Sequence, residues 1–165
     1  MVENLISAVS RVTKKAVIGA ISSSSEKAQS IVETTADLVK ATVAGAGDLT
    51  VAIEKRAGEI VSGSIEAAAE MGSDLFVTIK STVFGIVKAG AEVGADVGKA
   101  AVAATKAAIK AGGKAGTDVK ETTKEAVTGA VEAGDAVGAD VSKAVRDALA
   151  ESVDGAKEVI KPPAQ

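Results

Sequence analysis

Apolar side chains recur along this 165-residue chain at the spacing of α-helices. Near the N-terminus they are Leu5, Ile6, Val9, Val12, Ala16 and Ile21. In the last third they recur nearly every four residues, at Val119, Thr123, Val127, Val131, Val137, Val141, Val145, Leu149 and Val153. Such spacing places the apolar side chains on one face of a helix. The pattern therefore predicts an all-α fold of long amphipathic helices.

Small and capping residues divide this pattern into segments. We expect helices over residues 2–21, 26–44, 48–71, 74–111 and 118–160, within a single all-helical domain 1–165. The strongest break in the second half is residues 112–117, where three glycines precede a Thr-Asp pair. Pro162 and Pro163 end the last helix, so residues 161–165 are expected to form a Pro-rich tail.

A Gly-x-Asp motif stands in four copies, each 22 residues after the last, beginning at Gly72, Gly94, Gly116 and Gly138. Twenty-two residues are two 11-residue repeats, which keep one face of a helix aligned over a long distance. If the copies are turns, the helices are about 20 residues long and stack as antiparallel hairpins. If they lie within helices, the helices are continuous, and the valine stripe favours continuity through Gly138. Either way we expect elongated hairpins or a bundle rather than a compact globule.

The composition excludes several kinds of chemistry. The chain has no His, Cys, Trp or Tyr and a net charge of −3. Zinc-type metal sites, thiol nucleophiles and the commonest general base are therefore missing. The net negative charge does not indicate the basic surface that is typical of nucleic-acid-binding proteins. We expect a non-enzymatic protein with no catalytic residues, no metal, no cofactor and no nucleic-acid partner.

The apolar content is rich in small side chains. The chain has 34 Ala and 23 Val but only five Leu. Each alanine buries little area, so we expect another apolar surface to help stabilise the fold. The longest uncharged run, residues 16–25, is far shorter than the ~20 residues that span a bilayer. No secretory signal is recognised, so the expected compartment is the cytoplasm, with peripheral attachment to a membrane or lipid body as an alternative.

Residues 74–114 carry the features that most suggest a binding surface. The expected lipid or partner face consists of Phe76, Ile79, Lys80, Val83, Val87 and Lys88. Six lysines against two acids give residues 80–114 a local charge of +4, which suits an anionic lipid surface. The alternative is a core helix with a solvated basic edge. Small residues four apart also predict close helix packing at Gly90, Gly94, Gly98 and Ala101.

The segment Thr123-Lys124-Glu125-Ala126-Val127-Thr128-Gly129-Ala130-Val131 resembles the 11-residue units of synucleins and the repeats of perilipins. Late-embryogenesis-abundant proteins share its Ala/Lys/Glu/Thr-rich style. The resemblance implies an amphipathic helix that forms on lipid or on drying, with a coating or protective role.

These observations lead to one main hypothesis and two alternatives. The chain is expected to be a structural protein that associates with copies of itself, coats an anionic lipid surface through residues 74–114, or both. The first alternative is an accessory helical subunit of a larger complex. The second is a protectant against desiccation or freezing, which would be disordered in dilute solution.

Overall fold

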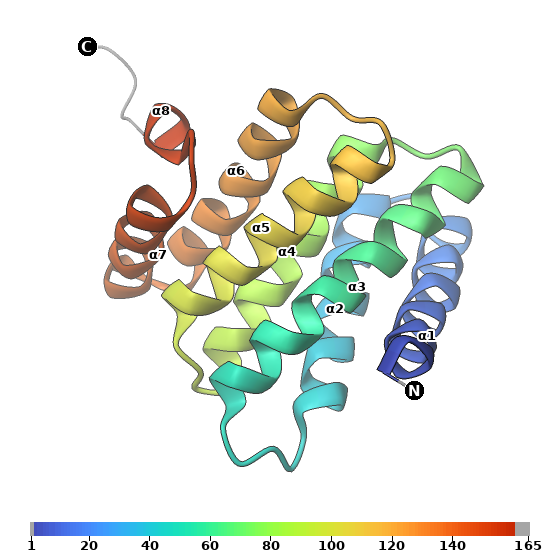
Figure 1. Ribbon diagram of the computed structural model, residues 1–165, viewed down its shortest axis with the longest axis horizontal. Coiled ribbons are helices and arrows are strands. Elements are labelled where there is room, and N and C mark those ends of the chain that lie inside the picture. The colour runs from blue at the N-terminus through green and yellow to red at the C-terminus, as the bar shows by residue number, and fades with distance from the viewer. Residues whose placement is uncertain (1, 161–165) are drawn as a thin grey trace.

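A computed structural model of the protein describes residues 2–160, with side chains from residue 8 onward, and Figure 1 shows its helices. They are α1 (Val2–Ser23), α2 (Lys27–Val43), α3 (Leu49–Met71), α4 (Leu75–Glu92), α5 (Val97–Lys114), α6 (Val119–Val137), α7 (Ala139–Ser152) and α8 (Ala156–Ile160). No strand occurs within this range, so the expected all-α fold is confirmed. The predicted tail, residues 161–165, lies outside the described residues.

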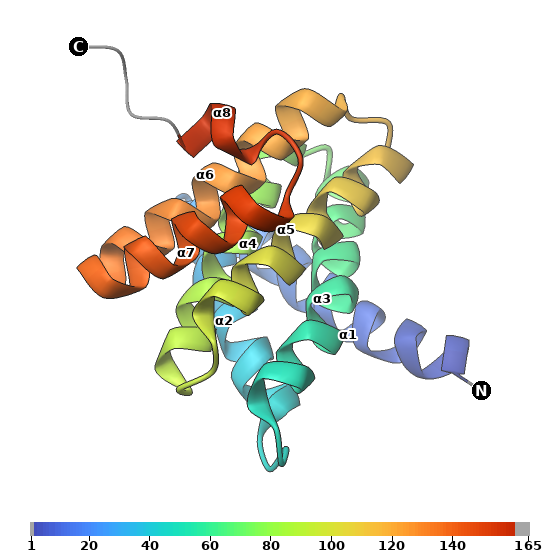
Figure 2. The same ribbon diagram turned by 60° about the vertical axis from the view of Figure 1, so that its left-hand side comes forward.

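The helices form two packed layers (Figures 1 and 2). Helices α1, α3, α5 and α7 lie side by side in one layer, and α2, α4, α6 and α8 form the other. Each helix from α3 to α8 therefore packs against the helix two before it as well as against its neighbours in the chain. The result is a compact bundle, and the expected elongated form is not observed.

The first three Gly-x-Asp copies are turns between helices. In each copy the glycine has a positive φ, between 65° and 89°, and lies at the C-cap of one helix or one residue after it. The aspartate two residues later accepts hydrogen bonds from backbone N–H groups in the first turn of the next helix. Glycine suits the left-handed conformation and aspartate suits the N-cap. In the middle of the chain, an 18-residue helix and a four-residue turn make one 22-residue period.

Two predicted helices are wrong as continuous elements. The segment 74–111 is divided between α4 and α5 by residues 93–96, and the segment 118–160 is divided among α6, α7 and α8. At the fourth copy the break is a single residue, Gly138, with φ 156°. The valine stripe continues beyond it because α7 buries its own apolar face, including Val145 and Leu149, in the same core. The 11-residue repeat is not confirmed, because the observed unit is a helix and its turn.

The core consists mainly of alanine, valine and isoleucine, so the helices approach closely at glycines. Gly63 on α3 lies against the backbone of Ser10 and the side chain of Thr13 on α1. The same contact recurs 22 residues later, where Gly85 on α4 lies against Val32 and Thr35 on α2. The sequence period thus corresponds to a repeated contact between helices two apart in the chain.

Candidate interaction surfaces

Most of the face expected to contact lipid or a partner lies inside the bundle. Ile79, Val83 and Val87 on α4 are completely buried. Helix α4 is central, since it contacts α2, α3, α5 and α6. These three side chains contribute to the core, and a lipid or partner molecule would reach them only if the bundle opened.

The other members of that face lie at its edges. Phe76 and Lys88 are half-buried. Lys80 forms an ion pair with Glu132 on α6, with 3.3 Å between the lysine Nζ and a carboxylate oxygen. Both side chains are substantially exposed, so the pair adds little to stability. The residues of the expected lipid or partner face do lie on one side of α4, but the neighbouring helices cover most of that side.

The four residues expected at a close helix contact have different roles. A Cβ atom on Gly90 would lie 3.3 Å from the Ala100 side chain, and one on Gly98 would lie 3.0 Å from the Ala148 side chain. Both glycines therefore allow close packing, α4 on α5 and α5 on α7. Ala101 is completely buried. Gly94 lies in the turn between α4 and α5, with φ 81° and no atom near its missing side chain.

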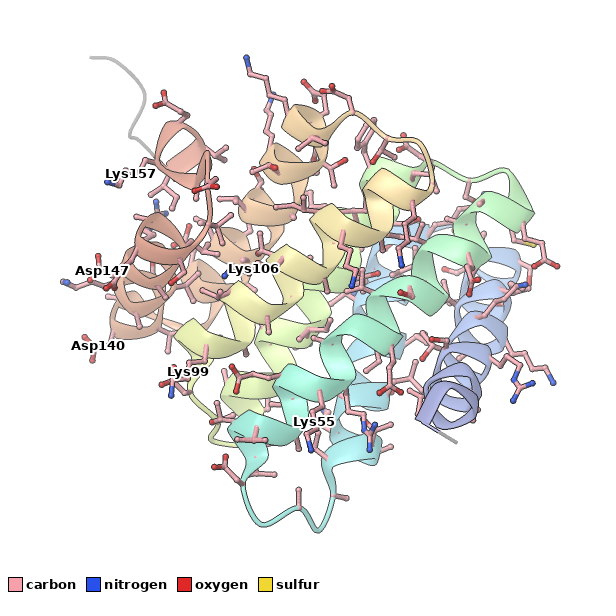
Figure 3. The ribbon with its side chains drawn as sticks, in the orientation of Figure 1. Lys55, Lys99, Lys106, Asp140, Asp147 and Lys157 are labelled. Atoms are coloured by element: carbon pink, nitrogen blue, oxygen red, sulfur yellow. The ribbon has the colours of Figure 1, made fainter. Side chains whose placement is uncertain are left out.

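A row of lysines follows the outer face of α5. Lys99, Lys106 and Lys110 are exposed, and Figure 3 labels the first two. None of the three forms an ion pair with a side chain of the described range. The spacing of seven and four residues places them on one side of the helix. Beside the row runs an open groove of about 470 Å³ between α5 and α7, whose charged lining is Glu54, Asp96, Lys99 and Glu151. The excess of acids there does not suit an anionic small molecule.

Both ends of the helix stack carry exposed charged side chains. At the α7/α8 end, Asp140, Asp147 and Lys157 project outward (Figure 3), and Lys143 pairs with Asp147 at 2.6 Å. At the α1/α2 end, an apolar groove of about 180 Å³ lies between the two helices. It is lined by Ala8, Val9, Val12, Thr13, Leu38 and Thr42. Exposed charged side chains flank this groove on both helices, so the α1/α2 end combines an apolar strip with a polar rim.

Sequence analysis did not single out this groove, although α1 carries a signal for it. The helix has two apolar rows, one with Val17 and Ile21 in the core and one with Val9 and Val12 at the surface. A helix at the end of a stack buries only one row, so the second row indicates an additional contact surface.

A polar cluster connects α6 to α7 across Gly138. The Ser142 hydroxyl donates a hydrogen bond to Asp135, and the Arg146 guanidinium lies 3.1 Å from the same carboxylate. These contacts, the Ser142 hydroxyl first and Arg146 after it, hold the pKa of Asp135 below its usual value. The cluster therefore links the end of α6 to the first turns of α7.

No group of three acidic side chains is placed to hold a metal ion among the side chains described, those of residues 8–160. None of the helices in that range is both long and apolar enough to cross a membrane. No protein-family model, curated protein or solved structure matches the chain.

Proposed function

We propose that the protein is a non-enzymatic structural protein whose role is carried by association with copies of itself. The observation that supports this proposal is the apolar groove at the α1/α2 end of the helix stack. This groove exposes apolar side chains, with Val12 58% exposed. Burial of such a surface is favourable in water, and the interior, built mainly from small side chains, gains from any added apolar contact.

A second candidate is contact with an anionic lipid surface. The observation that favours it is the lysine row on α5, within the segment for which sequence analysis expected lipid binding. Three exposed ammonium groups on one face suit phosphate headgroups, to which long lysine side chains can reach. This contact differs from the expected one because it uses charges rather than the buried apolar face of α4.

Circular dichroism and sedimentation equilibrium on the full chain, with and without anionic vesicles, test both candidates. Self-association predicts full helicity in buffer and a mass that rises with concentration. A lipid coat predicts a monomer that sediments with anionic vesicles. If the chain is a helical monomer at every concentration and does not bind the vesicles, both candidates are contradicted and the accessory-subunit hypothesis remains. A disordered chain in buffer favours the protectant hypothesis.

A further inference from the structure

The α1/α2 end carries a charge pattern around its apolar groove. On α1, Arg11 and Lys15 are exposed and stand four residues apart, beside the row that contains Ala8 and Val12. Neither of these cations forms an ion pair with a described side chain. The α1 side of the end is therefore basic and free to meet a partner.

The α2 side of the same end is acidic. Glu33 and Asp37 are exposed and four residues apart, beside the row that contains Leu38. The Asp37 side chain is 78% exposed, and its contact with Lys40 is long, at 3.9 Å. Lys40 lies closer to Glu92, at 3.4 Å. The two carboxylates thus remain available to cations of another molecule.

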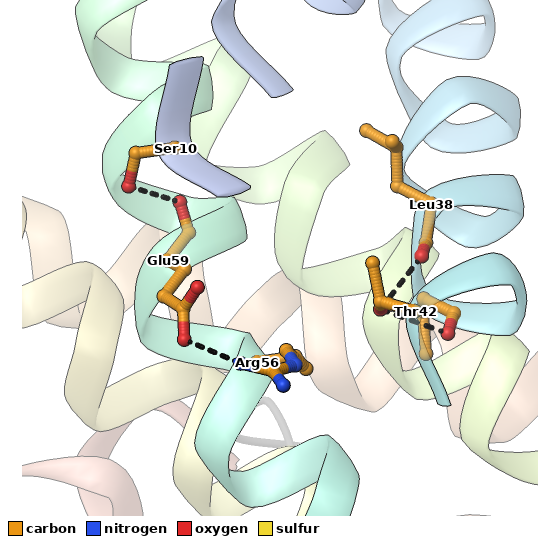
Figure 4. Close-up of polar contacts among 6 residues, drawn as sticks. Ser10, Leu38, Thr42, Arg56 and Glu59 are labelled. Carbon is orange, nitrogen blue, oxygen red and sulfur yellow. Dashed lines mark hydrogen bonds and ion pairs between the residues drawn. The ribbon is translucent and has the colours of Figure 1, made fainter. Parts of the chain in front are cut away.

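The groove between these charged rows offers few polar groups to a partner. The Thr42 hydroxyl donates to the carbonyl oxygen of Leu38 within α2, at 2.8 Å (Figure 4). The remaining lining atoms come from Ala8, Val9, Val12, Thr13 and Leu38. A partner must therefore bring apolar side chains to the centre of the interface.

Helix α1 is fixed well enough to present this face. Its Ser10 hydroxyl donates to the carbonyl oxygen of Glu59 on α3, at 3.2 Å (Figure 4). Lys14 pairs with Glu70 on α3 at 2.6 Å, and Gly63 brings the two backbones together. The row of α1 that contains Ala8 and Val12 consequently faces away from the bundle. The contacts with α3 on the other side of the helix hold it in place.

We propose that the α1/α2 end is the self-association interface and that its occupant is the same end of a second copy, related by a two-fold axis. This inference rests on the proposed function and locates it. In a two-fold interface each patch meets its own copy. With α1 of one copy over α2 of the other, Arg11 and Lys15 meet Glu33 and Asp37 twice, and Val12 enters the partner's groove beside Leu38.

The same charge pattern favours a second copy over a membrane. An anionic bilayer would attract the α1 side of the end, but it would repel Glu33 and Asp37 on the α2 side. A second copy satisfies both signs at once. The charges also set the orientation, because α1 placed over α1 would bring cations against cations.

Val12→Asp tests the apolar centre. Sedimentation equilibrium of the full chain should give a dimer whose Kd rises about 30-fold in the variant, as when an anchoring interface side chain is lost. Val119→Asp is the matched control, because Val119 on α6 is also 58% exposed but lies away from this end. It should leave Kd unchanged. Circular dichroism checks that both variants remain helical.

Charge reversal tests the orientation. Arg11→Glu and Asp37→Arg should each raise Kd about tenfold, and the double variant should recover most of the loss, because the two positions exchange signs across the axis.

The possible outcomes separate the inference from the function on which it rests. A wild-type dimer that Val12→Asp leaves intact overturns the interface but leaves self-association standing. A wild-type chain that is monomeric at every concentration overturns both. A monomer whose sedimentation with anionic vesicles is abolished by Val12→Asp assigns the groove to lipid and overturns the inference.

Discussion

Gly129 on α6 lies directly against the backbone of Lys80 on α4, where a Cβ atom on residue 129 would overlap the Lys80 carbonyl oxygen. Backbone atoms yield much less than the end of a flexible side chain. The distance between these two central helices is therefore set by the missing side chain at position 129.

Gly129→Ala should consequently destabilise the protein. Alanine is the better helix former by about 1 kcal/mol, but overpacking against a backbone costs about 1–3 kcal/mol. We expect a net loss in the free energy of unfolding, measured by urea titration followed by circular dichroism. Gly58→Ala on α3 is the control, since no atom lies within 4 Å of the added Cβ. It should gain stability, and a gain in both variants would contradict the close contact.

These two glycines show what the sequence could and could not predict. Gly58 and Gly129 both lie within helices, and nothing in their local sequence distinguishes open space from a backbone contact. Helical periodicity predicted the first three helices to within two residues of their observed ends. It identified the apolar face of α4 but not what covers that face, because the covering helices α2 and α6 are known only from the tertiary structure.

The valine stripe led to the wrong prediction of one continuous helix over residues 118–160 for a related reason. A periodic row of apolar residues records that each segment buries one face, and it does not record whether the segments are joined as one helix. The signal for the break before α7 is the fourth Gly-x-Asp copy at Gly138, and its single glycine would also be tolerated within a helix. The α1/α2 groove was equally hard to predict, because the sequence shows two apolar rows on α1 but not which of them its neighbours bury.

Gly94 provides a prediction that separates a turn from a packing contact. Its φ of 81° is left-handed, and no atom lies within 4 Å of an added Cβ. Gly94→Ala should therefore cost about 1–2 kcal/mol from backbone strain. Gly94→Asn should cost less, although asparagine is larger, because it tolerates that conformation. Urea unfolding gives both values. If the asparagine variant were the less stable one, space rather than φ would be the constraint.

The buried threonines differ in whether their hydroxyls are satisfied. Thr105 on α5 is completely buried, and its hydroxyl has no hydrogen-bond partner in the described part of the chain. Thr105→Val replaces that hydroxyl with a methyl of similar shape, so we expect stability to rise by about 1 kcal/mol.

Thr122 is the matched control for this substitution. It is equally buried, but its hydroxyl donates to the Asp118 carbonyl oxygen at 2.7 Å and lies 2.6 Å from the Thr117 hydroxyl. Thr122→Val should lower the melting temperature, whereas Thr105→Val should raise it. If both substitutions lowered the melting temperature by the same amount, the Thr105 hydroxyl would have to have a hydrogen-bond partner.

The cluster around Asp135 should make the docking of α7 sensitive to acid. The pKa of Asp135 is lowered in the folded chain, first by the Ser142 hydroxyl and then by Arg146. Its contribution to stability is therefore complete above the ordinary pKa of 3.8 and is lost as the pH falls through the lower folded value. Asp135→Asn should be less stable than the wild type at neutral pH by less than about 1 kcal/mol, because the group is largely exposed. Urea unfolding at several pH values should show this difference shrinking below pH 3.8. Ser142→Ala should reproduce part of the loss of stability at neutral pH. If the stability difference between Asp135→Asn and the wild type persisted unchanged into strong acid, the carboxylate charge would not be what holds α7.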